Sequence, residues 1–124
     1  MVIESTAPSG YLLSSDLFFA SKITGTADAI GLKVRVFNRA EDVVAATAET
    51  AARFLIVDLS LPGLDIAGLA AAIPHDCRPE IIAYDAHVRT DQLAAAQSAG
   101  CDAVLSRGQL SSQLPELLGR FATD

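Results

Sequence analysis

Basic residues are scarce in this chain, and long apolar runs are missing. Its 124 residues include nine lysines and arginines against fifteen acids, which gives a formal net charge of −6. The basic residues are scattered along the sequence, whereas binding to a nucleic-acid backbone needs them gathered in a patch or stripe. No apolar stretch approaches the length of a membrane span. These absences argue against direct nucleic-acid binding and against insertion into a membrane.

Cysteine is also scarce, with only Cys77 and Cys101. The two residues lack metal-ligand or redox-motif spacing, and two such thiols in a chain of this size are typical of a reducing compartment. Residues 1–10 contain neither a basic residue nor an apolar core, so they do not resemble a secretory signal. We therefore expect a cytoplasmic protein whose residues 1–9 form a flexible lead-in.

The chain is rich in apolar residues, which make up 51% of it, while charged residues make up 19%. This composition is typical of a folded protein and not of a disordered one. A chain of this length is expected to form one domain, residues 1–124, that buries roughly two-thirds of its unfolded surface.

Strand-like and helix-like patterns alternate along the sequence. Apolar runs predict strands at residues 11–15, 32–37, 54–58, 80–84 and 103–106. Helical patterns cover residues 17–30 after Asp16 as N-cap, 39–49, 91–99 after Thr90, and 113–121 after Ser112 as N-cap, with Pro115 in the first turn. This alternation predicts an α/β fold: a doubly wound, five-stranded parallel sheet of order 2-1-3-4-5, flavodoxin-like and three-layered.

Residues 54–65, FLIVDLSLPGLD, are the most informative segment. The apolar run predicts a central strand covered on both faces, and the strand ends on Asp58 shortly before a Pro-Gly turn. Open α/β sheets bind ligands beyond the carboxyl ends of their strands, at the switch point of the strand order. The expected order makes Asp16 and Asp58 face one pocket there. The alternatives are that Asp58 only caps its turn and that Asp16 only caps the first helix.

Two motifs make the chain resemble the receiver domain of two-component response regulators, from residue 11 to about residue 121. They are VDLSLPGLD at residues 57–65 and AGCDA at residues 99–103. The resemblance implies that Asp58 accepts a phosphoryl group in a phosphorelay. The donor would be a histidine kinase, a phosphotransfer protein or a small phosphodonor, and the domain would regulate a downstream protein target, with homodimerisation left open. It also implies Mg²⁺ as a cofactor, held by Asp16, Asp58 and the backbone carbonyl of Ser60.

Several positions depart from the residues usual in that family. Ser15 stands at the first of two acidic positions, Asp85 (or Tyr84, if the strand slips by one residue) at a small hydroxyl position, Arg107 at a lysine position, and Val104 at an aromatic position. A carboxylate at Asp85 would repel a phosphoryl group. Arg107 could hold Asp85 or Asp58 through its planar fork of donors. His87 is expected to line the same end of the sheet.

Three functions follow from these residues. The first is a stand-alone receiver-like signalling domain that is phosphorylated on Asp58, and the second is a degenerate pseudo-receiver that binds a protein without phosphorylation. The third is an aspartate-nucleophile, phosphatase-like enzyme. Such enzymes need a second aspartate two residues after the first, where this chain has Ser60. We therefore expect a signalling domain and not an enzyme.

Overall fold

A single parallel sheet forms the centre of the protein. The computed structural model describes residues 8–85 and 90–122. The strands are β1 (Gly10–Leu13), β2 (Val34–Phe37), β3 (Phe54–Asp58), β4 (Glu80–Asp85) and β5 (Ala103–Ser106). Their order across the sheet is β2-β1-β3-β4-β5, and each neighbouring pair is parallel. The predicted strand order is confirmed.

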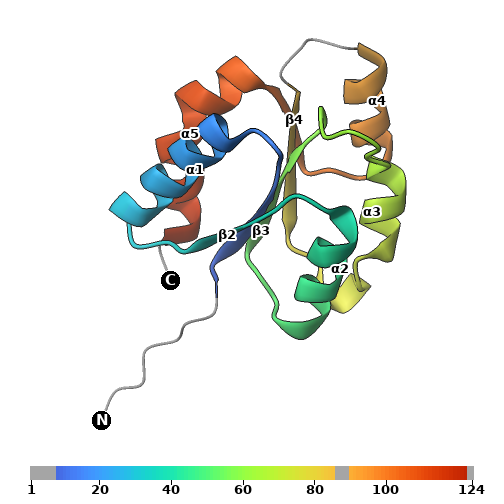
Figure 1. Cartoon of the computed structure of the whole chain (residues 1–124), viewed down its shortest axis with the longest axis horizontal. Coiled ribbons are helices and arrows are strands. Elements are labelled where there is room, and N and C mark those ends of the chain that lie inside the picture. The colour runs from blue at the N-terminus through green and yellow to red at the C-terminus, as the bar shows by residue number, and fades with distance from the viewer. Residues whose placement is uncertain (1–7, 86–89, 123–124) are drawn as a thin grey trace.

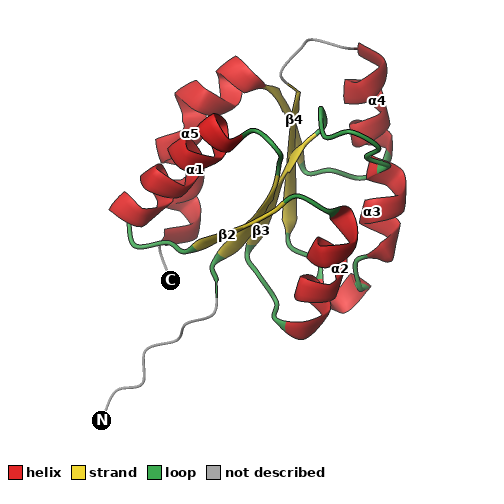
Figure 2. Ribbon diagram, in the orientation of Figure 1, coloured by secondary structure: helices red, strands yellow, loops and turns green. Residues whose placement is uncertain are grey.

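Helices cover both faces of the sheet. They are α1 (Leu17–Ala29), α2 (Ala40–Glu49), α3 (Ile66–Ala72), α4 (Thr90–Ser98) and α5 (Arg107–Ala122), with a short 3-10 helix at His75–Cys77. The helices α1 and α5 pack on one face, and α2, α3 and α4 pack on the other (Figures 1 and 2). The three-layer α/β architecture is therefore confirmed. Within the described residues, no helix has the length and apolar character needed to span a membrane.

The central strand β3 joins the two hydrophobic cores. Successive residues of a strand point to opposite faces, so Leu55 and Val57 pack toward α2, α3 and α4, while Phe54 and Ile56 pack toward α1 and α5. All four side chains are fully buried. A strand covered on both faces must be apolar throughout, and the first polar residue of β3 is Asp58, where the strand ends.

The start of α5 differs from the prediction. The helix begins at Arg107, directly after β5, and not after Ser112, so Pro115 lies inside the helix and not in its first turn. The reason is a capping box. The backbone N–H of Gln109 donates to Ser106 Oγ at 3.1 Å, and the N–H of Ser106 donates to Gln109 Oε1 at 2.9 Å. This cap places Arg107 in the first turn of α5, at the carboxyl end of β5.

Candidate functional site

The carboxyl ends of β1, β3 and β4 lie side by side in the sheet, and Asp58 ends the central strand of the three. Its side chain is only 4% exposed. Oδ2 accepts a hydrogen bond from Ser14 Oγ at 3.1 Å, and Oδ1 accepts one from the backbone N–H of Ser60 at 2.9 Å. Both oxygens of the Asp58 carboxylate are therefore engaged by donors of the chain itself.

Ser60 connects Asp58 to a second buried acid. Its backbone N–H bonds Asp58, while its hydroxyl donates to Asp85 Oδ1 at 2.9 Å. Asp85 is the last residue of β4 and is 1% exposed. The structure thus brings together Asp58, Ser60 and Asp85, with two carboxylates bound to one serine. A phosphoryl group placed here would meet the negative charge of Asp85.

The turn after β3 holds Ser60 in position. The N–H of Leu61 bonds the carbonyl of Asp58 at 3.1 Å, which closes the turn. Gly63 then has a φ of 75°, a left-handed conformation that favours glycine. Asp65 ends the turn by capping α3, because its Oδ1 accepts from the N–H of Gly68 at 3.0 Å. The turn predicted from the Pro-Gly pair is present, with a helix beginning directly after it.

Arg107 forms an ion pair with Asp16. Its Nη2 lies 2.7 Å from Asp16 Oδ2, and its Cζ lies 4.7 Å from the centre of the Phe19 ring. The other carboxylate oxygen of Asp16 caps α1 by accepting from the N–H of Phe19 at 3.1 Å. The suggestion that Arg107 holds Asp85 or Asp58 is therefore wrong for this structure. The guanidinium is held at the start of α1 because α5 begins at Arg107 and packs beside that helix.

Two residues complete the site: Ser14, which the sequence did not single out, and Tyr84, the alternative to Asp85 at the small hydroxyl position. Ser14, which follows β1, bonds Asp58 directly, and Tyr84 on β4 donates its hydroxyl to Ser14 Oγ at 3.4 Å. Burial raises the pKa of Tyr84 strongly, the bond with Ser14 lowers it, and the negative charges of Asp58 and Asp16 raise it further. The only sequence signal for Ser14 is a polar residue directly after an apolar strand.

Val104, another predicted position, does not join this network. Val104 packs against the core on the face covered by α2, α3 and α4. Its place on β5 gives the site neither an aromatic ring nor a polar group. His87 lies outside the residues that the structure describes.

The carboxylates of this site do not fit a resident Mg²⁺. This ion takes about six oxygen ligands in near-octahedral geometry. Here Asp58 accepts two hydrogen bonds, and Asp16 is paired with Arg107. Among residues 8–85 and 90–122, no three His, Cys, Asp or Glu side chains are grouped to hold a metal ion. The ligand set implied by the resemblance would require Asp16 to leave Arg107.

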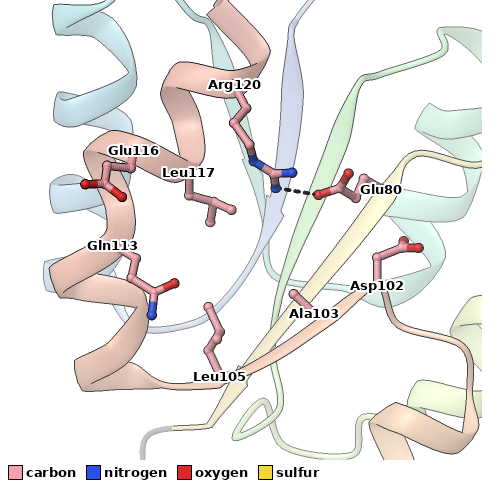
Figure 3. Close-up of a pocket in the computed structure, with 8 residues that line it drawn as sticks. All are labelled: Glu80, Asp102, Ala103, Leu105, Gln113, Glu116, Leu117 and Arg120. Carbon is pink, nitrogen blue, oxygen red and sulfur yellow. Dashed lines mark hydrogen bonds and ion pairs between the residues drawn. The ribbon is translucent and has the colours of Figure 1, made fainter.

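A separate groove lies at the opposite, amino ends of β4 and β5 (Figure 3). It encloses about 450 Å³ between these strands and α5. An ion pair crosses it, from Arg120 Nη2 to Glu80 Oε2 at 2.8 Å, and Leu117 and Leu105 form part of its wall. Because it opens at the other end of the sheet, this groove is not part of the Asp58 site.

The structure of this chain is similar to known proteins, whereas its sequence gives no match to a family model or a curated protein. No protein-family model matches the sequence, and no curated protein matches it. Solved structures do match. A response regulator from Thermotoga maritima is 14% identical with a TM-score of 0.74, and the match covers 95% of this chain and 99% of that one. A signal receiver domain from Bermanella marisrubri is 16% identical with a TM-score of 0.78, and the match covers 92% of this chain and 97% of that one.

A third similar structure is described with a metal. It is the receiver domain of a sensor histidine kinase from Pseudomonas aeruginosa, with a magnesium ion coordinated in its active-site cleft. It is 18% identical with a TM-score of 0.77, and the match covers 94% of this chain and 98% of that one. At these identities the likeness concerns the fold. The chain has the fold of a response regulator receiver domain.

Proposed function

We propose that this chain is a receiver-like signalling domain that works as a phosphorylation-independent, protein-binding module. The observation that carries the proposal is the hydrogen bonding of Asp58, whose carboxylate accepts from Ser14 and from Ser60. A carboxylate satisfied in this way, and almost fully buried, is a poor nucleophile. An incoming phosphoryl group would have to displace at least one of its donors.

The charges around Asp58 support the same proposal. Phosphoryl transfer needs cations to neutralise the phosphoryl oxygens. Arg107, the cation at the family's lysine position, is engaged by Asp16, and Asp85 adds a negative charge on the far side of Ser60. The arrangement therefore favours a site that stays unphosphorylated over one that alternates between phosphorylated and free states.

Two exposed apolar side chains beside the site, Leu17 and Phe18, offer a surface for a protein partner. Leu17 and Phe18, in the first turn of α1, are 76% and 89% exposed. Leu17 borders a groove of about 480 Å³, whose other lining residues are Ser14, Ser15, Val36, Phe37, Asn38 and Asp42. Adjacent large apolar side chains in contact with water are typical of interaction sites. We therefore propose that the partner protein contacts Leu17 and Phe18.

Two measurements test the proposal. The protein is incubated with Mg²⁺ and a small phosphodonor, and its intact mass is compared with that of Asp58→Asn treated in parallel. We expect no adduct on either protein. Thermal unfolding is then measured with and without Mg²⁺ at matched ionic strength, and we expect no shift of the unfolding temperature. A site that binds Mg²⁺ would add about 1.4 kcal/mol of stability at a Mg²⁺ concentration of about ten times its dissociation constant. An adduct that depends on Asp58, or a clear Mg²⁺ shift, would overturn the proposal.

Phosphorylation of Asp58 is the second candidate function. What favours it is the position of Asp58 at the carboxyl end of β3, flanked by β1 and β4 at the switch point of the strand order. In this case the partner would be a histidine kinase or phosphotransfer protein, and Mg²⁺ would bind together with the phosphodonor. The mass measurement distinguishes the two candidates, because only this one predicts an adduct that Asp58→Asn abolishes.

A further inference from the structure

The hydroxyl of Ser14 has no spare hydrogen-bonding capacity. It donates to Asp58 Oδ2 at 3.1 Å, accepts from the backbone N–H of Asp16 at 3.0 Å, and accepts from the Tyr84 hydroxyl at 3.4 Å. A serine hydroxyl has one proton to donate and two lone pairs to accept with. Because Ser14 is also buried, water cannot readily replace a lost partner. If the hydrogen bonding of Asp58 to Ser14 changes, the hydrogen bond from Tyr84 or the one from the Asp16 backbone must therefore change as well.

These contacts continue into a closed circuit on the α1 and α5 face. The Tyr84 ring lies 5.1 Å from the Phe19 ring, centre to centre, at a tilt of 56°. Phe19 in turn lies beneath the Arg107 guanidinium at 4.7 Å. Arg107 pairs with Asp16, whose N–H returns to Ser14. The circuit joins the carboxyl ends of β1 and β4 to the first turns of α1 and α5.

We propose that Ser14 and Tyr84 couple the Asp58 carboxylate to the ion pair between Arg107 and Asp16. A change in the charge or hydrogen bonding of Asp58 is then transmitted to the first turns of α1 and α5. The coupling goes beyond the proposed binding function, since it does not require Asp58 to be phosphorylated. It makes Tyr84 a positioning residue for the Arg107 and Asp16 pair.

Hydrogen-bond polarity explains how the coupling works. In Asp58→Asn the backbone N–H of Ser60 still requires an oxygen, so the new amide NH₂ faces Ser14. Ser14 must then accept from the amide, and it already accepts from Asp16 and Tyr84. The bond from Tyr84 is the longest of the three and is the one displaced. Movement of the Tyr84 ring changes its contact with Phe19, on which the Arg107 guanidinium rests.

The contacts of the coupling lie on the face of the sheet that α1 and α5 cover. Neighbouring residues of a strand point to opposite faces, so Tyr84 packs toward α1 and α5 whereas Asp85 does not share that core. Val104 lies in the core on the other face and has no polar atom to receive a change at Asp58. The contacts therefore direct the response to α1 and α5.

A double-mutant cycle tests the coupling by amide hydrogen exchange. The amides followed are Ala20, which bonds the carbonyl of Asp16, and Leu110 in the first turns of α5. Asp58→Asn should accelerate exchange at both by about two- to thirtyfold, the range found along such networks. In a Tyr84→Phe background the same substitution should have no effect on these amides. The Thr50 amide, which bonds the Ala46 carbonyl in α2, should not respond to Asp58→Asn in either of these two backgrounds.

The control variant is Tyr11→Phe, which removes the other tyrosine hydroxyl. Tyr11 is also buried, but it bonds the Thr50 and Ala46 carbonyls on the opposite face. In the Tyr11→Phe background the response of the Ala20 and Leu110 amides to Asp58→Asn should persist. In the otherwise wild-type protein, Ser14→Ala alone should produce the same response. The coupling is refuted if the response survives in Tyr84→Phe, or if exchange rises equally at Thr50. It is also refuted if neither Asp58→Asn nor Ser14→Ala changes the two amides.

Discussion

The two tyrosines allow a direct test of the packing on both faces of the sheet. The chain contains two tyrosines and no tryptophan, so its tyrosinate absorbance reports on Tyr11 and Tyr84 alone. Both side chains are buried, and burial raises the pKa of each. In the folded protein neither should ionise near pH 10, where free tyrosine does. We expect tyrosinate to form only as the protein unfolds in alkali.

The sign and size of the effect follow from proton linkage. Above about pH 10 the unfolded chain releases its tyrosine protons, while the folded chain keeps them. The stability that each tyrosine contributes is therefore complete below about pH 10, and it is lost as the pH rises toward the folded-state pKa. Each retained proton lowers the free energy of unfolding by about 1.4 kcal/mol per pH unit. The loss for two tyrosines approaches about 2.7 kcal/mol per pH unit where the unfolded chain has released both protons and the folded chain keeps them.

The assay follows ultraviolet tyrosinate absorbance and far-ultraviolet circular dichroism through one alkaline titration. The two signals should change together in the wild-type protein. Chemical unfolding at several alkaline pH values should show a shallower loss of stability in Tyr84→Phe than in the wild type. Burial of Tyr84 at the site would be refuted by reversible tyrosinate formation near pH 10 in Tyr11→Phe, which retains only Tyr84, while its circular dichroism stays native.

Two further predictions concern the elements that position the site. Gly10→Ala should lower stability by about 1–3 kcal/mol, because its Cβ would lie 2.3 Å from the buried Phe54 ring. The matched change Gly25→Ala, in open space on α1, should raise stability by about 0.5–1 kcal/mol; urea unfolding of both variants checks these opposite signs. Ser106→Ala removes the cap of α5 and should cost about 1 kcal/mol, with faster amide exchange in the first turn of α5, whereas an unchanged first turn would contradict the capping box.

The fold could be predicted because its signals are local and repeated. Apolar strands alternate with amphipathic or capped helices, and the parallel sheet follows from that alternation. The start of α5 could not be found in the same way. The segment from Ser106 to Gln109 contains a glycine and follows a strand without a loop, so it suggests a connection and not a helix. The capping box was visible in the spacing of Ser106 and Gln109, but Ser112 and Pro115 offered a competing helix start.

The site was predictable where it depends on the end of one strand. Asp58 follows four apolar residues and precedes a turn, which places it without knowledge of any contact. The partners of Asp58 and Arg107 could not be predicted, because they depend on how separate elements pack. Ser14 reaches Asp58 across a separation of 44 residues. Arg107 reaches Asp16 because α5 starts early and lies beside α1, and that start was misplaced.

The unusual residues of the site are consistent with one another electrostatically. Buried carboxylates must be balanced by donors or cations. At Asp58 the balance comes from a hydroxyl and a backbone N–H, at Asp16 from Arg107, and at Asp85 in part from the Ser60 hydroxyl. Ser14, directly after β1, supplies the proton of the hydrogen bond that Asp58 Oδ2 accepts. Loss of the Ser14 hydroxyl would leave Asp58 one donor short, and loss of the Arg107 guanidinium would leave Asp16 without this ion pair, so the residues of the site depend on one another.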